Sequence, residues 1–230
     1  MFKRKIFLNV IVIIFISVFF ACGEKSGGDK KVSSSRSRSS SGAENGSRIK
    51  IATFNLKFFG DNDRINNEDF GKFGKNLREP DDKLMKKITD LIKDVDILAV
   101  QEVENEKAIS RLVDYMNKRF KNSKYKFYIY AKKSSCQNVG LIWNTKRLNG
   151  WRGYKFEKSF NVVDKTEERD IRFSRTPIYN HFEISGVKFT VVAVHLKAKG
   201  ISEDGGKREK EAQKLADWIE YQNSKEGNEH

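Results

Sequence analysis

Residues Asp96 to Asn105 read DILAVQEVEN, and the organisation of the chain is best understood from this stretch. Four apolar side chains in succession, Ile97 to Val100, predict a short strand that is buried on both faces. Gln101 and Glu102 follow at once. A carboxylate at the end of a buried strand is costly to desolvate unless a cation or a hydrogen-bond donor compensates it. Glu102 is therefore either a solvated acid at a strand end or part of a polar site.

Two other predicted strands end in polar side chains of a similar kind. Residues 49–56 read IKIATFNL and carry Asn55 near their end, and residues 187–196 read VKFTVVAVHL and carry His195. Each side chain taken alone also fits an ordinary strand-end or turn residue. Three strands that deliver Asn, Glu and His together favour one site at one edge of a sheet.

The remaining pattern predicts a mixed α+β architecture. Helices are expected to begin at Pro80-Asp81-Asp82, after an Asn105 cap, and over residues 207–222. Their expected inward-facing residues are, helix by helix, Leu84, Met85, Ile88, Leu91 and Ile92; Ile109, Leu112, Val113 and Met116; Ala212, Leu215, Ala216 and Ile219. Strands are expected over residues 126–131, 139–143, 178–184 and 187–195, with a hairpin turn at Ser185-Gly186. Early helices followed by antiparallel strands favour mixed sheets over a regularly alternating parallel sheet.

The N-terminus has the pattern of an export signal. Three cations at positions 3–5 precede an apolar run over residues 6–21, and Cys22 follows Ala21. The order Phe19-Phe20-Ala21-Cys22-Gly23 resembles a bacterial lipoprotein processing site, in which Cys22 would be lipidated. An ordinary signal peptide and an uncleaved anchor are the alternatives. We expect a signal peptide over 1–21, a lipidated Ser/Gly-rich linker over 22–47, a folded domain over 48–222 and a polar tail over 223–230.

The net charge indicates a class of ligand, and the cysteine count indicates whether disulfides are expected. The formal net charge is +14, which suits a polyanionic ligand, although lysine-rich surfaces are also common without one. Lys57, Lys197 and Lys199 lie next to the candidate site residues in sequence. The chain has two cysteines, so lipidation of Cys22 would leave Cys136 unpaired and no disulfide framework is expected.

Five motifs in order resemble the endonuclease/exonuclease/phosphatase family, the deoxyribonuclease I-like metal-dependent phosphodiesterases. They are TFNL, QEVEN, NVGLIWN, RTP and VVAVHLKA, spread between Arg48 and about Gln222. The resemblance implies a four-layer α/β/β/α sandwich of two mixed sheets, with the active site at one end.

The resemblance also implies roles for four residues. Glu102 matches the family's Mg²⁺-binding glutamate, with Mn²⁺ or Ca²⁺ as alternative ions, and Asn55 matches an asparagine that helps to hold the metal or its water. His195 matches the histidine that contacts the scissile phosphate, where a cationic imidazole could stabilise charge or supply a proton. Arg175, before Thr176-Pro177, matches a position near the substrate backbone.

Two motifs of the family are absent. Members continue into a strand ending GDxN and later reach SDH, and neither sequence occurs here. We therefore expect a C-terminally truncated member in which the water-orienting half of the site is missing, an apolar sheet edge is exposed, and activity is weak or absent. A separate polypeptide could carry the missing half.

Three functions follow from this pattern. The first is a membrane-tethered, Mg²⁺-dependent nuclease-like phosphodiesterase. The second is a phosphodiesterase or phosphatase that acts on phospholipid headgroups or small phosphoesters. The third is a non-catalytic remnant that binds polyanions. The basic charge favours nucleic acid as the substrate of the first.

Overall fold

The computed structural model describes residues 9–15, 48–60, 79–132, 135–150, 154–155, 173–196 and 205–227. Several of the expected features lie outside these ranges. They are the lipidation site Cys22, the whole of the 22–47 linker, and the cations Lys197 and Lys199. Within the described part of the chain, no helix is both long and apolar enough to cross a membrane.

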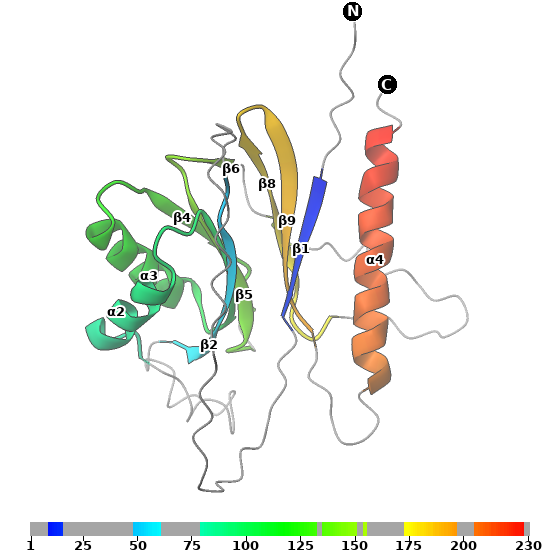
Figure 1. The fold of residues 1–230 in the computed structure, drawn as a ribbon. Helices are drawn as coiled ribbons and strands as arrows, with labels where there is room; N and C mark the ends of the chain where they lie inside the picture. Colours follow the sequence, from blue (N-terminus) through cyan, green and yellow to red (C-terminus); the bar gives the residue numbers. More distant parts are fainter. Residues whose placement is uncertain are drawn as a thin grey trace, which may run out of the picture.

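Two mixed β-sheets lie face to face at the centre of the molecule (Figure 1). The first has the order β2 (Ile51–Phe59), β3 (Ile97–Val103), β5 (Asn138–Asn144) and β4 (Tyr125–Ile129). Strands β2 and β3 are parallel, whereas the other pairs are antiparallel. The second has the order β1 (Asn9–Phe15), β9 (Val187–His195), β8 (Ile178–Ile184) and β6 (Asn149–Gly150), and β7 (Tyr154–Lys155) also pairs with β8.

Helices cover the outer faces of both sheets, so the molecule has four layers (Figure 1). Helices α2 (Asp82–Leu91) and α3 (Glu106–Arg119) lie on the first sheet, and α4 (Gly205–Gly227) lies on the second. The expected α+β class and its α/β/β/α arrangement are confirmed. The predicted strand over 126–131 runs from Tyr125 to Ile129, and the one over 139–143 is longer by a residue at each end.

Alternating side chains of the strands hold the layers together. In β3, Leu98 and Val100 pack toward α2 and α3, while Ile97 and Ala99 pack between the sheets. In β9, Val192 and Val194 lie on the outer face of the second sheet and pack toward α4. Both central strands are therefore buried on both faces, as their continuous apolar runs predict.

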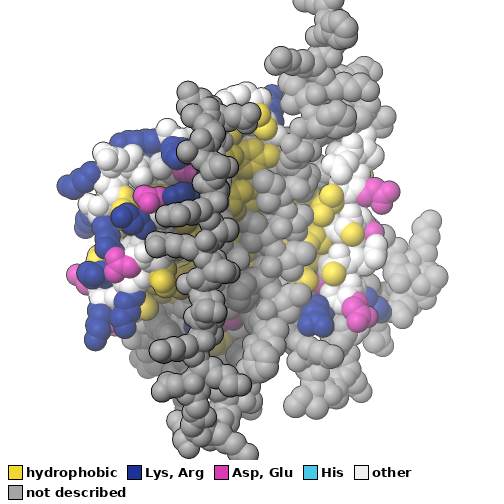
Figure 2. Space-filling model, viewed as in Figure 1, with side chains coloured by type: hydrophobic (Ala, Val, Ile, Leu, Met, Phe, Trp, Pro, Cys, Tyr) yellow, Lys and Arg dark blue, Asp and Glu magenta, His cyan; other side chains and the backbone are white. Residues whose placement is uncertain are grey.

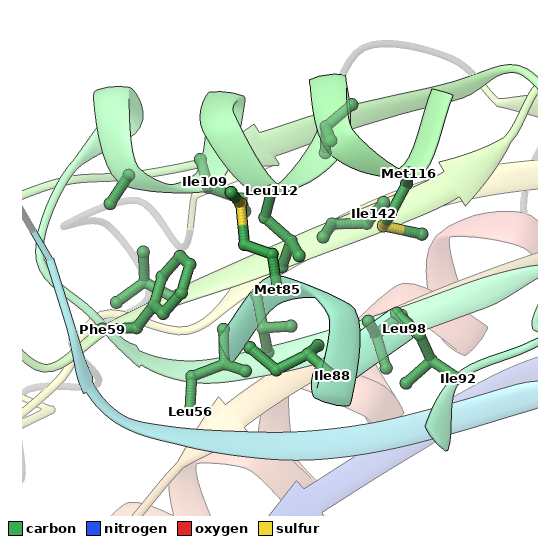
Figure 3. Packing of buried hydrophobic residues seen from close by; sticks show 14 of the residues in the cluster. Leu56, Phe59, Met85, Ile88, Ile92, Leu98, Ile109, Leu112, Met116 and Ile142 are labelled. Atoms are coloured by element: carbon green, nitrogen blue, oxygen red, sulfur yellow. The ribbon is translucent and has the colours of Figure 1, made fainter. Parts of the chain in front are cut away.

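The layer between the first sheet and its helices is the largest apolar cluster that the structure describes (Figure 3). Met85, Ile88 and Ile92 of the first predicted helical stripe are buried there, and so are all four residues predicted for α3. The assignment of Leu91 to the core is wrong, because its side chain is 72% exposed.

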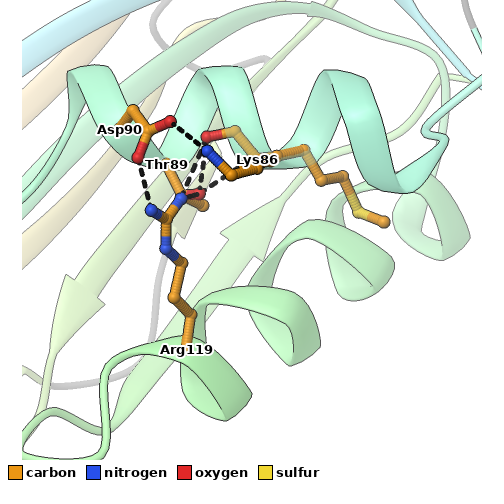
Figure 4. A network of polar contacts seen from close by, with 5 residues as sticks. Lys86, Thr89, Asp90 and Arg119 are labelled. Atoms are coloured by element: carbon orange, nitrogen blue, oxygen red, sulfur yellow. Dashed lines mark hydrogen bonds and ion pairs between the residues drawn. The ribbon is translucent and has the colours of Figure 1, made fainter.

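Both helices begin where the capping residues predict. The Asp81 carboxylate accepts a hydrogen bond from the Leu84 amide at 2.6 Å, and Asn105 accepts one from the Ala108 amide at 2.8 Å. At the other end of α3, Arg119 reaches back to Asp90 and Thr89 of α2 (Figure 4). Arg119 and Lys86 lower the pKa of the Asp90 carboxyl, which is exposed, so this network joins the helices with little effect on stability.

The inward face predicted for the last helix is correct for Leu215, which is buried, and for Ile219, which packs against the same cluster, and it is wrong for two alanines. Ala212 and Ala216 are exposed, and the side chains packed against the second sheet include Glu211, Lys214, Leu215 and Trp218. Trp218 offers more apolar surface than two alanines, so the helix is turned toward it. Helix α4 also extends to Gly227, into the segment expected to be a polar tail.

The edge of the second sheet, which we expected to be exposed, is paired with a further strand. Residues Asn9–Phe15, from the predicted signal peptide, form β1 and pair in parallel with residues 189–195 of β9. A strand at this position satisfies backbone groups that would otherwise form an open sheet edge.

We expect Gly140→Ala to lower the free energy of unfolding by about 1–3 kcal/mol, as overpacking does in a dense core. A Cβ at Gly140 would lie 2.7 Å from Ile109 Cδ1 and 2.9 Å from Val100 Cγ2. Urea unfolding measures the loss, and adding Ile109→Val, which removes Cδ1, should restore part of it. Gly206→Ala is the matched control, because a Cβ there meets no atom within 4 Å. Equal effects of both alanine substitutions would contradict this account of the packing.

Candidate active site

The candidate site lies where β2 and β3 end side by side. Asn55 pairs with Gln101 in the parallel ladder, and beyond this pair the register of both strands shifts. Glu102 has a φ of +59°, and Lys57 and Phe58 have φ angles of 51° and 59°. Positive φ is costly for residues with a Cβ and concentrates at functional sites. The irregular backbone thus redirects Glu102 at the strand end.

Asn55 holds the Glu102 carboxylate in place. Its Nδ2 donates a hydrogen bond to Glu102 Oε1 at 2.9 Å, and its Oδ1 accepts one from the Lys57 amide at 2.8 Å. Glu102 is 3% exposed, so this bond offsets part of the cost of burying the carboxylate. In this arrangement Asn55 orients the carboxylate, and its own amide oxygen accepts from the irregular part of β2 that follows it.

His195 lies beside this pair at the end of β9. Its Nε2 is 3.8 Å from Glu102 Oε1, beyond direct hydrogen-bond distance. Burial, and to a smaller extent the nearby Arg175 cation, lower the pKa of His195 to about 4. The imidazole is therefore neutral at neutral pH. A neutral imidazole can donate one N–H and accept at its other ring nitrogen.

Arg175 completes the cluster from the segment before β8. Its Nη2 donates a hydrogen bond to Gln137 Oε1. Burial lowers the pKa of Arg175, and the carboxylates of Glu211 and Glu102 act in the opposite direction. The guanidinium is thus close enough to interact with both Glu102 and His195. The structure brings all four sequence-predicted residues into one neighbourhood.

Sequence reasoning missed three residues that contact or support Arg175. Gln137 binds the guanidinium, and Glu211 of α4 accepts a hydrogen bond from the Ser174 amide at 2.6 Å. Gln137 and Ser174 lie in irregular segments that carry no periodic signal. Glu211 does leave a signal, because it lies four and seven residues before Leu215 and Trp218 on the buried face of its helix.

The donor set for a metal is sparse. Within the described ranges no group of three or more His, Cys, Asp or Glu side chains is arranged to hold an ion. Among the described residues, Glu102 offers a carboxylate that is held by Asn55. Magnesium can be bound through one or two carboxylates with several waters and substrate phosphates, so this chemistry fits a water-rich Mg²⁺ site and not a fully protein-ligated one.

Cys136 is buried close to the site and forms no disulfide. Burial is the main reason that its pKa is raised, and Glu104 and Glu102 raise it further. Because the thiolate is the reactive form, this environment disfavours a nucleophilic role.

Comparisons with known proteins find similarity only among solved structures. No protein-family model and no curated protein matches the chain. A crystal structure of humanized D. rerio TDP2 with 14 mutations shares 15% identity over 76% of this chain and 57% of that one, with a TM-score of 0.46. An endonuclease/exonuclease/phosphatase family protein from Bacteroides thetaiotaomicron shares 13% identity over 79% of this chain and 59% of that one, with a TM-score of 0.45.

A third similar structure is the mannosyl-6-phosphatase Bt3783 of B. thetaiotaomicron, with 14% identity over 79% of this chain and 61% of that one, and a TM-score of 0.46. The chain spans less than two thirds of each of these proteins. Identities and TM-scores in this range do not establish a family for the chain.

We expect stability to fall with pH more steeply in the wild type than in His195→Gln. The pKa of His195 is about 4 when folded, against an ordinary value of 6.5, so the unfolded chain binds the extra proton between these limits. The contribution of the neutral imidazole is complete above pH 6.5 and is lost as pH falls toward 4. Between pH 7 and pH 4.5, the free energy of unfolding of the wild type should fall by about 2–3 kcal/mol more than that of His195→Gln. Urea unfolding in EDTA at several pH values measures it, and parallel profiles would contradict the burial argument.

Proposed function

We propose that residues 48–227 form a phosphodiesterase domain of the endonuclease/exonuclease/phosphatase type that acts on nucleic acid with Mg²⁺. The observation that carries this proposal is the buried Glu102–Asn55 pair with His195 and Arg175 beside it. A carboxylate, a neutral imidazole and a guanidinium at one end of a two-sheet sandwich suit the binding and cleavage of a phosphoester. The order of the five motifs supports the same assignment.

Each residue has a defined part in this proposal. Glu102 would hold the metal ion, which when bound would polarise a phosphoryl oxygen. Asn55 fixes the rotamer of Glu102 through their hydrogen bond. The neutral His195 can donate one N–H to a phosphoryl oxygen, and Arg175 supplies the positive charge that a phosphate requires. The imidazole thus orients the substrate, and the guanidinium attracts it.

The charge of the chain supports nucleic acid as the substrate class. The formal charge of +14 gives long-range attraction to polyanions. In Figure 2, Lys and Arg side chains are spread over the part of the molecule that contains α2 and α3. Lys57, directly beyond the Asn55 side chain, is exposed and adds charge near the site. Binding should therefore weaken strongly as salt concentration rises.

The set of groups near Glu102 also supports weak catalysis. Efficient phosphoryl transfer needs a positioned water and a metal together with cations around the transferring group. The described residues supply a carboxylate and a cation, while GDxN and SDH sequences do not occur. A missing general base typically costs about 10²–10⁴ in rate, so we propose low or no activity for this chain alone.

The proposal is tested by titrating the full chain with Mg²⁺ and Mn²⁺ and following amide signals by NMR. We expect shifts and Mn²⁺ broadening around Asn55 and Glu102, and we expect Glu102→Gln to abolish them because the amide carries no charge. Glu106→Gln is the matched control, since Glu106 is an exposed acid four residues away. Metal effects that persist in Glu102→Gln would contradict the assignment.

Substrate class is tested in the same preparation with plasmid DNA, RNA and phosphoinositide vesicles. Cleavage of DNA or RNA that disappears in His195→Ala would support the nuclease proposal but contradict the proposed low activity. Cleavage of the vesicle lipids alone would favour the headgroup alternative.

We further propose that the domain is tethered to a bacterial membrane through a lipid on Cys22. The basic, apolar and Ala-Cys segments occur in the order that lipoprotein signals require. Labelling of cells with a radioactive fatty acid should mark the wild type and spare Cys22→Ser. Cys136→Ser is the control for the second cysteine, and equal labelling of the wild type and Cys22→Ser would rule out this tether.

A further inference from the structure

The segment before β8 is held on two sides. On one side Arg175 donates from Nη2 to Gln137 Oε1, next to the start of β5. On the other side the Ser174 amide donates to Glu211 Oε1 of α4 at 2.6 Å. Glu211 is fully buried, at 0% exposure. Ser174 is thus held by α4, and Arg175 is held by the residue before β5. These two contacts limit how far the guanidinium can move.

Two polar atoms of this segment lack hydrogen-bond partners. Ser174 Oγ and Arg175 Nη1 are both buried, and neither has a partner in the structure. Buried polar atoms are nearly always paired, and leaving one unpaired costs about 1–3 kcal/mol, with more for a charged group. A ligand with several acceptor oxygens would satisfy both of these donors.

The charges around these atoms define the ligand. Glu102 and Glu211 both interact with Arg175, and Glu102 is already bonded to Asn55, as Glu211 is to the Ser174 amide. The buried guanidinium thus keeps an unpaired donor although two carboxylates lie near it. Arginine with a neighbouring hydroxyl is a suitable pair for the oxygens of a phosphoryl group.

We propose that Ser174 Oγ and Arg175 Nη1 form a phosphoryl-oxygen binding site, and that Glu211 is the positioning residue that aims it. This inference rests on the proposed function for its ligand class. Glu211 does not touch the ligand. It fixes the Ser174 backbone, and its charge stabilises the protonated guanidinium in a buried place. Gln137 fixes the guanidinium plane by occupying Nη2 and leaving Nη1 for the ligand.

The test measures phosphate binding without metal. The full chain in EDTA is titrated with inorganic phosphate, and the Nε–H signal of Arg175 is followed by NMR. We expect the wild type to bind with a shift of this signal and Arg175→Ala to lose binding. Glu211→Ala should weaken binding about tenfold or more, the amount expected when a charge-assisted contact is misplaced. Glu211→Gln, which keeps an oxygen for the Ser174 amide, should weaken it less.

Controls separate positioning from loss of structure. Glu209→Ala changes an exposed acid on the same helix and should leave binding and the Arg175 signal unchanged. Melting temperatures of all variants are compared, and Glu211→Gln decides the case if Glu211→Ala does not fold. A phosphate affinity of Glu211→Gln and Glu211→Ala within about twofold of the wild type would overturn the role of Glu211. Absence of an Arg175 shift in the wild type would overturn the site.

The source of the phosphoryl group is distinguished with two dinucleotides. Preference for pTpT over TpT assigns the site to a terminal phosphate, and equal binding assigns it to an internal phosphodiester. Because these experiments contain no metal, their failure leaves the Glu102 metal assignment standing. Conversely, a chain that binds phosphate through Arg175 but shows no metal effect at Glu102 would retain this site and lose the proposed hydrolase.

Discussion

The hydrogen bond from Asn55 to Glu102 is the interaction on which the site depends. It joins the ends of two parallel strands and gives a buried carboxylate a partner that does not neutralise it. Without that partner, Glu102 would be a desolvated anion without this hydrogen-bond donor, which is costly. The positive φ of Glu102 is retained because the ladders with β2 and β5 fix the backbone on either side.

The four-layer packing explains why His195 and Arg175 reach the same place. β9 lies in the second sheet and has one face toward the first, so the imidazole at its end approaches Glu102 across the inter-sheet layer. Arg175 reaches it from the segment that α4 and the start of β5 hold. Burial and the Arg175 cation lower the pKa of the imidazole, which keeps it neutral at neutral pH. The site therefore combines one buried anion and one cation with a neutral ring between the two sheets.

Local signals predicted most of the fold. Caps at Asp81 and Asn105, apolar periodicity in α3 and continuous apolar runs in β3 and β9 depend on neighbours in sequence, and all were found where expected. Leu91 and two alanines of α4 were misplaced because apolar periodicity marks the inward face of a helix only approximately, and the tertiary partner selects which residues are buried. The charge of His195 could not be predicted, since it depends on burial by residues distant in sequence. Gln137 and Ser174 lack any periodic pattern.

The pairing of β1 with β9 makes the timing of synthesis important. Asn9 is opposite Phe189, so 180 residues separate the partners. At about 5–20 residues per second, β9 leaves the ribosome roughly 10–40 seconds after β1. Contacts of such long range also form slowly. If residues 1–21 direct export, as proposed, the segment can engage a membrane receptor before its own strand partner exists. In a chain that misses this interval, the segment pairs with β9 at the edge of the second sheet and is no longer an unpaired segment that a receptor can engage.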